Sequence, residues 1–585
     1  MNMALFRRFL LVLLSLSAVL GARAASVRAD GASIYVNEIE VIKLRVPSGG
    51  RSPSERAAYL APILQDDLAA GGLKVVKAGR NFRVVVGGKP WALVTADEAK
   101  ASGSTPEGLA QQWCAAINSA LALPAFKLAE HDLKIPAAGK RMISMVGGHA
   151  RDVVVSVADP KVASAGLTGA TLTVQGAAPG TTQLTLSYAA QTETVTVEVE
   201  PLAAYLPQTL TAYVTGTPAS RDTVVGTVVE AVNNDLKSVE GAQVSFTPPA
   251  GVEIQTGESH SFLIHVRVAG PESFPSEGYV SVTVRNTPIG YREEADLWYS
   301  NDPEPVPKPM RLFAAALQAD SPVRMLYHHI NRSGSTMIMS VEAINNTDTP
   351  ARVLIIPGDA DPAQNPVQAG FEAADRFVLD WSRYSGEIVD VPPFSILPIS
   401  LRRMHRNDTV SGLCYLRLLD GGPKQLVVCA ETRRPSVVDH KWKAAMASAT
   451  PWRVAGTKPI GDLASVPQPD AIHIYPNPFK QEKVTYKVGG PFGFVRIGQT
   501  PIARQDNRGS LDGNFGVIYT IDASIVNQTA SPADVEVVYE ASAGYGGALF
   551  LIDGALRTTP LLQPKEETRL TRIRLDPNSS KEIRI

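Results

Sequence analysis

Cys414 and Cys429 have the spacing that a disulfide bond needs. They flank the turn sequence at 420–423 and lie in two apolar runs, so we expect them on the two arms of one hairpin. Pairing about the centre of that turn sets them opposite each other at a non-hydrogen-bonded site, where Cα atoms approach to about 4.5 Å. The sequence therefore predicts a disulfide, with two reduced core thiols as the alternative. Cys114 is expected to stay unpaired.

Asp359 and Asp361 are the weak candidates for a metal site. With Gly358 before them and Asn365 after, they place oxygen ligands on one loop, as calcium needs. The closing bidentate Glu of a calcium loop is not evident, so a solvated loop is the favoured interpretation. We therefore predict neither a metal nor a cofactor for this chain.

Two further clusters carry titratable or basic side chains. His328 and His329 are adjacent, and neighbours in an extended segment point to opposite faces, so the pair is poorly placed to bind one metal. The basic run at 402–406 is interpreted as a solvated turn in preference to a contact for an anion or a glycan.

The common enzyme signatures are missing from the sequence. It contains no G-x-S-x-G, no Walker A loop, no H-E-x-x-H and no C-x-x-C. The chain is therefore predicted not to be an enzyme. Glycosidase chemistry remains an alternative, because two carboxylates brought together by folding leave no local motif.

The first residues have the pattern of a secretory signal peptide. Arg7 and Arg8 precede an apolar run over 9–20, and Ala22 and Ala24 form an A-x-A cleavage site. We expect cleavage after Ala24, since the apolar run is shorter than the roughly 18 residues that cross a bilayer. The mature chain is then expected in the periplasm or at the cell surface, with no membrane span.

The composition is that of several folded domains. A chain of 585 residues is too long for one hydrophobic core and suits roughly four or five domains. Its 56 basic and 57 acidic side chains leave a formal charge of −1, so no overall field favours nucleic acid. Nucleic acid is therefore excluded as an expected partner.

Residues 25–126 alternate strand and helix signals. Ser52, Pro53 and Glu55 form a helix start with a capping box, and a second helix starts at Thr105. Pro62 is expected to kink or shorten the first helix. Hairpins precede each helix, so the segment is predicted to be a small α+β domain.

Residues 127–203 are predicted to be all β, with short strands separated by turns. Three stretches carry a resemblance to known modules: Val155-Ser156-Val157-Ala158-Asp159-Pro160-Lys161-Val162-Ala163, Leu172-Thr173-Val174-Gln175-Gly176 and Ala178-Pro179-Gly180-Thr181-Thr182. On these residues the segment resembles the N-terminal module of secretin-type pilus formation proteins and bacterial immunoglobulin-like repeats. The resemblance implies an immunoglobulin-like domain and a role beside a pilus. No secretin channel domain is recognisable, so a pore does not follow.

The next segments are predicted to be β-rich and separated by linkers. Residues 204–301 combine a helical pattern with clean strand alternation. In 302–309 every second residue is proline from Pro303 onward, which predicts an extended linker. Residues 310–435 and 470–585 are predicted to be two sandwiches joined by a second linker over 436–469.

The two sandwiches share a sequence pattern. In 344–353 and again in 526–535 a strand ends at Asn, and Pro-Ala leads into the next strand. We interpret this as an internal repeat; chance similarity of turn sequences is the alternative.

The sequence as a whole predicts a mainly β fold: a multi-domain array of immunoglobulin-like β-sandwiches with a small α+β domain at the N-terminus. The predicted function is an exported, non-catalytic structural or binding protein of the periplasm or cell surface. The sequence does not identify its partner; a cell-surface protein and a glycan are the candidates. The alternatives are an accessory protein of a pilus or secretin-type secretion system and, third, a glycan-active enzyme.

Overall fold

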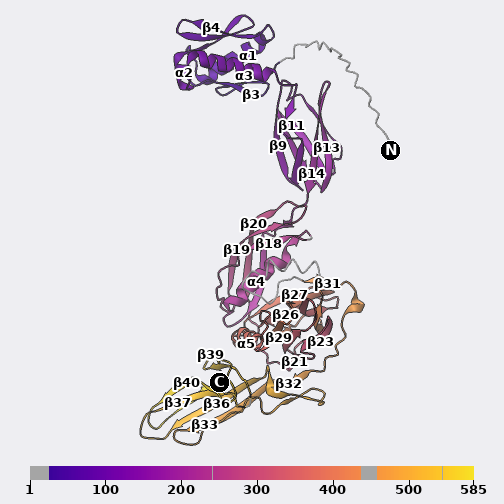
Figure 1. Ribbon diagram of the computed structural model, residues 1–585, viewed down its shortest axis with the longest axis vertical. Helices are drawn as coiled ribbons and strands as arrows, with labels where there is room; N and C mark the ends of the chain where they lie inside the picture. The colour runs from indigo at the N-terminus through magenta and orange to yellow at the C-terminus, as the bar shows by residue number, and fades with distance from the viewer. Residues whose placement is uncertain (1–24, 240, 436–456, 543) are drawn as a thin grey trace, which may run out of the picture. The chain divides into compact units, whose positions relative to one another are not determined.

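The computed structural model describes residues 25–239, 241–435, 457–542 and 544–585. The predicted signal peptide at 1–24 lies outside these residues, as does most of the predicted linker at 436–469. The chain divides into two compact units, one of Met1–Leu202 with Glu272–Phe274 and one of Ala203–Pro271 with Pro275–Ile585. The described chain is a mainly β, multi-domain array of sandwiches (Figure 1), as the sequence predicts.

The first unit begins with the predicted α+β domain. Its elements are two three-stranded antiparallel sheets, β1 (Val27–Asp30), β2 (Ser33–Val36) and β3 (Ile39–Lys43), then β4 (Leu73–Ala78), β5 (Asn81–Val86) and β6 (Lys89–Val94), with three helices, α1 (Pro53–Leu68), α2 (Ala96–Ala101) and α3 (Pro106–Leu121). Apolar residues at helical spacing, such as Leu64 and Ile117, bury one face of each long helix in a shared core.

Helix α1 begins as its sequence predicts and ends later than expected. Ser52 accepts a hydrogen bond from the Glu55 main chain, and the Glu55 side chain accepts one from Ser52 N at 2.7 Å, which is a complete capping box. Pro62 lies inside the helix, which continues to Leu68. Pro62 therefore does not shorten the helix, and the other expected effect, a kink at Pro62, stays a prediction.

The second part of the first unit is an immunoglobulin-like sandwich. Its sheets follow the orders β10-β13-β14-β8 and β11-β12-β9-β7. The strands are β7 (Lys127–Leu128), β8 (Asp132–Pro136), β9 (Lys140–Val146), β10 (Val154–Val157), β11 (Ala163–Thr168), β12 (Thr171–Gly176), β13 (Gly180–Tyr188) and β14 (Gln191–Glu200). Alternate residues of β13 and β14, such as Leu184 and Val197, face the core because side chains of a strand alternate between its two faces.

The second unit opens with one helix packed on a sheet. The sheet segment contains β16 (Thr209–Thr215), β18 (Gln243–Phe246), β19 (Ser259–Ala269) and β20 (Ser276–Asn286), with the small pair β15 (Ala204–Tyr205) and β17 (Lys237–Ser238) beside it. Helix α4 (Arg221–Asp235) buries Val224, Val228 and Val232 against the inner face. The outer face of β19 and β20 stays exposed, as clean alternation predicts.

The middle sandwich of this unit has two sheets. Its strands are β21 (Asp296–Ser300), β22 (Pro305–Val306), β23 (Met310–Gln318), β24 (Val323–Asn331), β25 (Met337–Asn345), β26 (Ala351–Ile356), β27 (Gly386–Val391), β28 (Ser395–Met404), β29 (Thr409–Leu418) and β30 (Gln425–Arg433). One sheet has the order β23-β30-β25-β28 and ends on β31 (Lys458–Pro459). The other contains β27-β26-β29-β24-β21 and continues through β16 into the preceding segment.

The structure corrects the domain boundaries around this sandwich. Strand β16 pairs with β27, so 204–301 and 310–435 share one eleven-stranded sheet instead of forming separate domains. The predicted proline linker at 302–309 contains β22, which pairs with β24 and buries Val306 completely. Proline at Pro305 does not prevent this, because β22 lies at the edge of the sheet and needs few N–H donors. Limited proteolysis is therefore not expected to begin there.

The C-terminal module is a smaller sandwich. Its strands are β33 (Phe479–Lys487), β36 (Ile518–Asn527), β37 (Ala533–Glu540), β40 (Glu567–Leu575) and β41 (Ser579–Arg584), with short hairpins β34 (Ile502–Ala503) to β35 (Ser510–Leu511) and β38 (Leu549–Ile552) to β39 (Ala555–Thr558). One sheet is β33-β36-β41 and the other is β37-β40. Strand β32 (Ile474–Pro476) pairs with β21 of the middle sandwich, so the predicted boundary at 470 is a few residues early.

Helix α5 (Pro366–Ser382) was missed at the sequence level. Asn365 caps it, Pro366 is its first residue, and Ala369, Ala373 and Phe377 form its buried stripe. These are ordinary helix signals, obscured because 358–365 were interpreted as part of a polar loop. Within the described part of the chain, no helix has the length and apolar character needed to cross a membrane.

Candidate functional site

The predicted pairing of Cys414 with Cys429 is wrong. Strand β29 pairs with β24 and β26, whereas β30 pairs with β23 and β25, so the two arms of the turn belong to different sheets. Cys414 lies opposite Met325, and Cys429 lies opposite Ala314. All three cysteines are free and buried, including Cys114. The turn at 420–423 therefore connects one sheet to the other across the sandwich.

Thiol titration should distinguish three free thiols from a disulfide between Cys414 and Cys429. We expect three free thiols after unfolding in denaturant, and slow modification of Cys414 and Cys429 in the folded protein because burial raises the pKa of both thiols. Alkylation followed by mass spectrometry under non-reducing conditions measures this. A cross-linked peptide pair containing both residues would contradict the observed strand order.

Asp359 is part of a buried ion pair and not of a calcium loop. It is 2% exposed, and its Oδ2 lies 2.8 Å from Arg402 Nη2 and accepts a hydrogen bond from Ser400. Burial raises the pKa of this carboxyl, against the effect of Arg402. Asp361 points elsewhere, 3.4 Å from Arg376, and its side chain is 61% exposed. The two carboxylates are therefore bound to different arginines.

The same contact corrects the interpretation of the basic run at 402–406. Arg402 lies on β28 and is 1% exposed, with Nε donating to the Ala360 carbonyl at 3.3 Å. Only His405 and Arg406 are exposed, in the turn that follows. The run therefore begins in strand β28 and ends in the turn that follows it. Its first arginine, Arg402, connects β28 to the loop after β26.

His329 lies in a closed hydrogen-bonded site. Its ring is fully buried, and Nδ1 donates to the Pro303 carbonyl at 2.9 Å, which leaves Nε2 to accept from the Ser300 hydroxyl at 2.9 Å. His328 faces away and lies 3.9 Å from Glu304. The expectation that the two rings face apart is confirmed by these contacts. The Ser300 and His329 pair has the bonding of a nucleophile and its base, but both side chains are sealed from solvent.

Burial of His329 should make the middle sandwich sensitive to acid. Desolvation lowers the pKa of His329 from 6.5 to about 4, so the unfolded chain binds this proton more readily than the folded one. Its contribution to stability is complete above about pH 6.5 and decreases toward pH 4, by at most about 1.4 kcal/mol per pH unit. Hydrogen exchange of 323–331 in urea, measured for the protein and for His329→Gln from pH 7.5 to 4, should give curves of local stability against pH that diverge in this window. Parallel curves would contradict the prediction.

The most deeply buried ion pair joins Glu294 and Arg324. Glu294 Oε1 accepts from Arg324 Nε at 3.0 Å, from Arg324 Nη2 at 2.7 Å and from Trp381 Nε1 at 2.9 Å. Both charged side chains have no exposed surface. Arg324 Nη1 also donates to the Gly516 carbonyl at 2.8 Å, and its guanidinium carbon lies 5.0 Å from the centre of the Phe479 ring. The pair therefore connects β24, α5 and the C-terminal module.

The two corners of the predicted repeat have the same hydrogen bonds. Asn345 Oδ1 accepts from Thr347 N and Oγ1, and its Nδ2 donates to Thr349 O at 2.8 Å. Asn527 Oδ1 accepts from Thr529 N and Oγ1. Its Nδ2 donates to Ser531 O at 2.9 Å. The two corners therefore share one hydrogen-bonding pattern, and the relation between the two sandwiches, predicted from 344–353 and 526–535, stays a prediction.

A third copy of the corner was missed in the sequence. Asn331 Oδ1 accepts from Ser333 N and Oγ, and Nδ2 donates to the carbonyls of Ser335 and Met404. The pattern that all three corners share is N-x-[ST]-x-[ST], and the copy at Asn331 lacks the Pro-Ala ending of the other two. Each copy also fits the N-x-[ST] glycosylation sequence. All three asparagines are completely buried, so their side-chain nitrogens serve the fold and are closed to modification.

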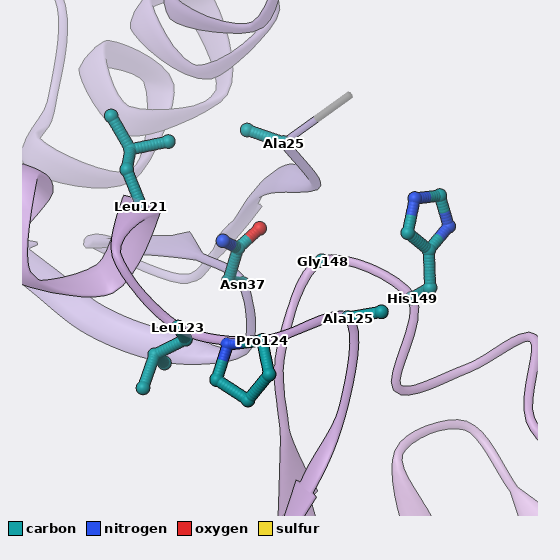
Figure 2. Close-up of a pocket in the computed structure, with 8 residues that line it drawn as sticks. All are labelled: Ala25, Asn37, Leu121, Leu123, Pro124, Ala125, Gly148 and His149. Carbon is teal, nitrogen blue, oxygen red and sulfur yellow. The ribbon is translucent and has the colours of Figure 1, made fainter. Parts of the chain in front are cut away.

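A small pocket lies in the first unit. Figure 2 shows its lining: Ala25, Asn37, Leu121, Leu123, Pro124, Ala125, Gly148 and His149. Its cavity of about 20 Å³ has room for about one water molecule. Asn37 organises it, with Nδ2 donating to Ala120 O at 2.9 Å and Oδ1 accepting from Ser26 N at 3.0 Å. The pocket therefore lies where the two hydrogen bonds of Asn37 connect the segment of Ala25 and Ser26 to the end of α3.

The ion pairs and hydrogen bonds described above lie at separate buried positions in the part of the chain that the structure describes. There, no group of three or more His, Cys, Asp or Glu side chains is placed to hold a metal ion. The ion pairs of Glu294 and Asp359 and the hydrogen bonds of His329 each join separate elements. Glu294 and Arg324 left no local sequence signal, because they are 30 residues apart and only folding brings them together.

Comparison with known families covers the first domain. The profile of a family described as a domain of unknown function, DUF8459, matches residues 33–123. The match spans β2 to α3 of the α+β domain, leaves out β1, and ends before the first sandwich. No curated protein matches the sequence.

Solved structures give partial matches of low score. Domains 5-6 of the S-layer protein SbsC are 16% identical, with 28% of this chain and 98% of that chain covered and a TM-score of 0.13. Titin immunoglobulin tandem domains A164-A165 are 8% identical, with 28% and 97% covered and a TM-score of 0.13. Human mucin-like protocadherin EC1-2 is 11% identical, with 28% and 98% covered and a TM-score of 0.12. Each of these matches covers 28% of this chain, and the fold class of the chain rests on the strand pairings described above.

Proposed function

We propose that this protein is an exported, non-catalytic structural or binding protein of the periplasm or cell surface. The observation that supports the proposal is that four charged side chains able to take part in chemistry are buried in ion pairs that connect structural elements. Glu294, Arg324, Asp359 and Arg402 are buried ties between strands, helices and loops. A side chain committed to a buried pair is unavailable to a substrate, and it holds neighbouring elements in one arrangement.

The sheet architecture supports the same role. One eleven-stranded sheet runs through two successive segments of the second unit, with β16 paired to β27. Main-chain hydrogen bonds across this junction resist bending better than a flexible linker would. The outer face of β19 and β20 leaves Leu263 and Tyr279 more than 60% exposed, which offers a broad surface for a protein or glycan partner.

Export and the absence of turnover are the two testable parts of this proposal. We expect fractionation of the source cells to place the protein in the periplasm or on the surface, with a mature N-terminus at Ala25 by mass spectrometry. We also expect no product above background on a panel of polysaccharides. Full-length protein that begins at Met1 in the cytosol, or sustained glycan turnover by the purified chain, would overturn the proposal.

An accessory role at a pilus or secretin-type system is the second candidate. It is supported by the resemblance of 127–203 and by the two four-stranded sheets that this segment forms. Co-purification with pilus assembly proteins from surface fractions would favour it. Recovery of the exported protein free of such proteins would favour the general structural role.

A further inference from the structure

The loop after β33 in the C-terminal module exposes two phenylalanines. Phe492 and Phe494 are 79% and 74% exposed, and the centres of their rings lie 6.1 Å apart with one ring edge-on to the other. Ile497 in the same loop is 44% exposed. These residues belong to 488–501, which joins β33 to β34 and which we call the phenylalanine loop. Neighbouring exposed apolar side chains mark a surface that another molecule covers.

The first half of the phenylalanine loop is packed on β33. Gly490 N donates to Lys487 O at 2.9 Å, which closes a turn directly after the strand. Gly493, between the two phenylalanines, lies against β33, since a Cβ atom at that position would be 2.8 Å from Val484 Cγ2. The main chain therefore contacts the module at Gly493, while the rings on either side of it stay exposed to solvent.

The second half of the phenylalanine loop is held by hydrogen bonds. Gly498 N donates to Tyr519 Oη at 2.9 Å, and Asn514 Nδ2 donates to Thr500 O at 2.8 Å. Lys480 Nζ also donates to Thr500 O. Asn514 is 5% exposed, so its hydrogen bond is shielded from water. Because the loop is attached at both ends, the exposure of its phenylalanines is a property of the fold.

The loop and the strand before it carry a positive net charge. Segment 479–501 contains one acidic residue, Glu482, and four basic ones: Lys480, Lys483, Lys487 and Arg496. Lys487 and Arg496 lie on either side of the phenylalanines, and both are exposed. Neither of these two forms an ion pair with any residue that the structure describes. Unpaired cations beside exposed rings favour a partner that combines negative charge with an apolar interior.

An anionic lipid bilayer fits this combination better than the surface of a folded protein. Apolar side chains that dominate a protein interface fill matching pockets on the partner and are surrounded by further close-packed contacts. Fluid hydrocarbon accepts an exposed ring without a matching pocket, and anionic headgroups attract Lys and Arg side chains at the same surface. The phenylalanine loop offers both kinds of side chain within a few residues.

We propose that the phenylalanine loop binds the surface of an anionic lipid bilayer. The rings of Phe492 and Phe494 enter the boundary between headgroups and acyl chains, and Lys487 and Arg496 lie at the level of the headgroups. The contact is peripheral and uses the loop alone. This proposal rests on the non-catalytic binding role proposed above and deepens it, because it names a membrane surface as the partner.

Flotation with lipid vesicles tests the proposal on the chain from Ala25 to Ile585, which lacks the apolar run of the predicted signal peptide. We expect binding to vesicles of phosphatidylcholine with about 30% phosphatidylglycerol, and binding weaker by about tenfold or more to phosphatidylcholine alone. Added salt should weaken the binding, because it screens the attraction between headgroups and basic side chains. Slower hydrogen exchange of 488–501 on the vesicles locates the contact.

Removal of the two rings should abolish most of the binding. The double variant Phe492→Ser with Phe494→Ser should weaken binding to the anionic vesicles about tenfold or more, because neither ring is then transferred out of water. The matched control is Leu263→Ser with Tyr279→Ser. These two side chains are 68% and 64% exposed on β19 and β20, so the control removes a similar apolar surface elsewhere and should leave binding unchanged.

Removal of the two charges tests the role of the headgroups. Lys487→Gln with Arg496→Gln should weaken binding to the anionic vesicles about tenfold and should have little effect on the weak binding to phosphatidylcholine. The control is Lys237→Gln with Arg267→Gln, which removes one exposed lysine and one exposed arginine from another part of the chain. Hydrogen exchange of 518–527 in each variant shows whether the C-terminal module is still folded.

No flotation at about 1 mM anionic lipid would overturn the proposal. Equal losses of binding in the phenylalanine variant and in its control would do the same, since the binding would then not be specific to the loop. Self-association without lipid that the phenylalanine variant abolishes would also overturn it, because a second copy would then cover the rings. These results would leave the proposed exported, non-catalytic role standing, since that role is tested by fractionation and by turnover assays.

Discussion

Replacement of Glu294 by Gln should lower the free energy of unfolding of the middle sandwich by about 3–5 kcal/mol. The carboxylate accepts three hydrogen bonds, two from Arg324 and one from Trp381. Glutamine keeps the shape and removes the charge, so the Arg324 guanidinium stays buried without a counter-ion. Its remaining contacts, the Gly516 carbonyl and the Phe479 ring, do not replace a negative charge.

A double variant separates the cost of a lone charge from the loss of packing. Glu294→Leu with Arg324→Met removes both charges and keeps most of the buried volume, so it should be more stable than Glu294→Gln. Because the chain contains several modules, one unfolding curve is not a two-state measurement. Hydrogen exchange of 323–331 in urea reports the local stability instead. Equal protection in the protein and in Glu294→Gln would contradict the prediction.

Replacement of Asn527 by Asp should destabilise the C-terminal module by about 2–4 kcal/mol. Asn527 Nδ2 donates to the carbonyls of Ser531 and Asp576, both at 2.9 Å. An aspartate oxygen in that place donates nothing when ionised and faces two carbonyl oxygens, each left without its partner in a buried site, at about 1–3 kcal/mol for an unsatisfied group. Exposed Gln528 is the matched control, and Gln528→Glu should have little effect.

The substitution Asn345→Asp tests whether the corner contributes to stability in the middle sandwich as it does in the C-terminal module. Asn345 Nδ2 donates to Thr349 O at 2.8 Å and to the carbonyls of Val391 and Pro392 at 3.1 Å. Asn345→Asp should therefore destabilise the middle sandwich at least as much as Asn527→Asp destabilises the C-terminal one, while exposed Asn346→Asp should not. Hydrogen exchange of 337–345 and 518–527 measures the two modules separately. A loss confined to one module would show that the two corners differ in energetic importance.

The sequence by itself determined those features of the fold that depend only on residues close together in the chain. The alternation of β19 and β20, the capping box of α1, the helix pattern of α4 and the corners at Asn345 and Asn527 were predicted because each needs only residues a few positions apart. The mainly β, multi-domain class followed from the same local signals. The corner at Asn331 is equally local, but it lacks the Pro-Ala ending that the sequences after Asn345 and Asn527 share.

The tertiary structure alone decided which strands are neighbours and which polar side chains meet. Cys414 and Cys429 flank one turn, yet β29 and β30 belong to different sheets. The same turn residues can connect two strands of one hairpin or two strands in opposite sheets of a sandwich, so the turn sequence does not decide which strands pair. The proline-rich segment at 302–309 joins a sheet edge instead of forming a linker. The pairs of Glu294 with Arg324 and Asp359 with Arg402 bridge residues far apart in the sequence. Their attraction matters only after burial removes water from around both charges, and that burial is a property of the fold and not of any segment.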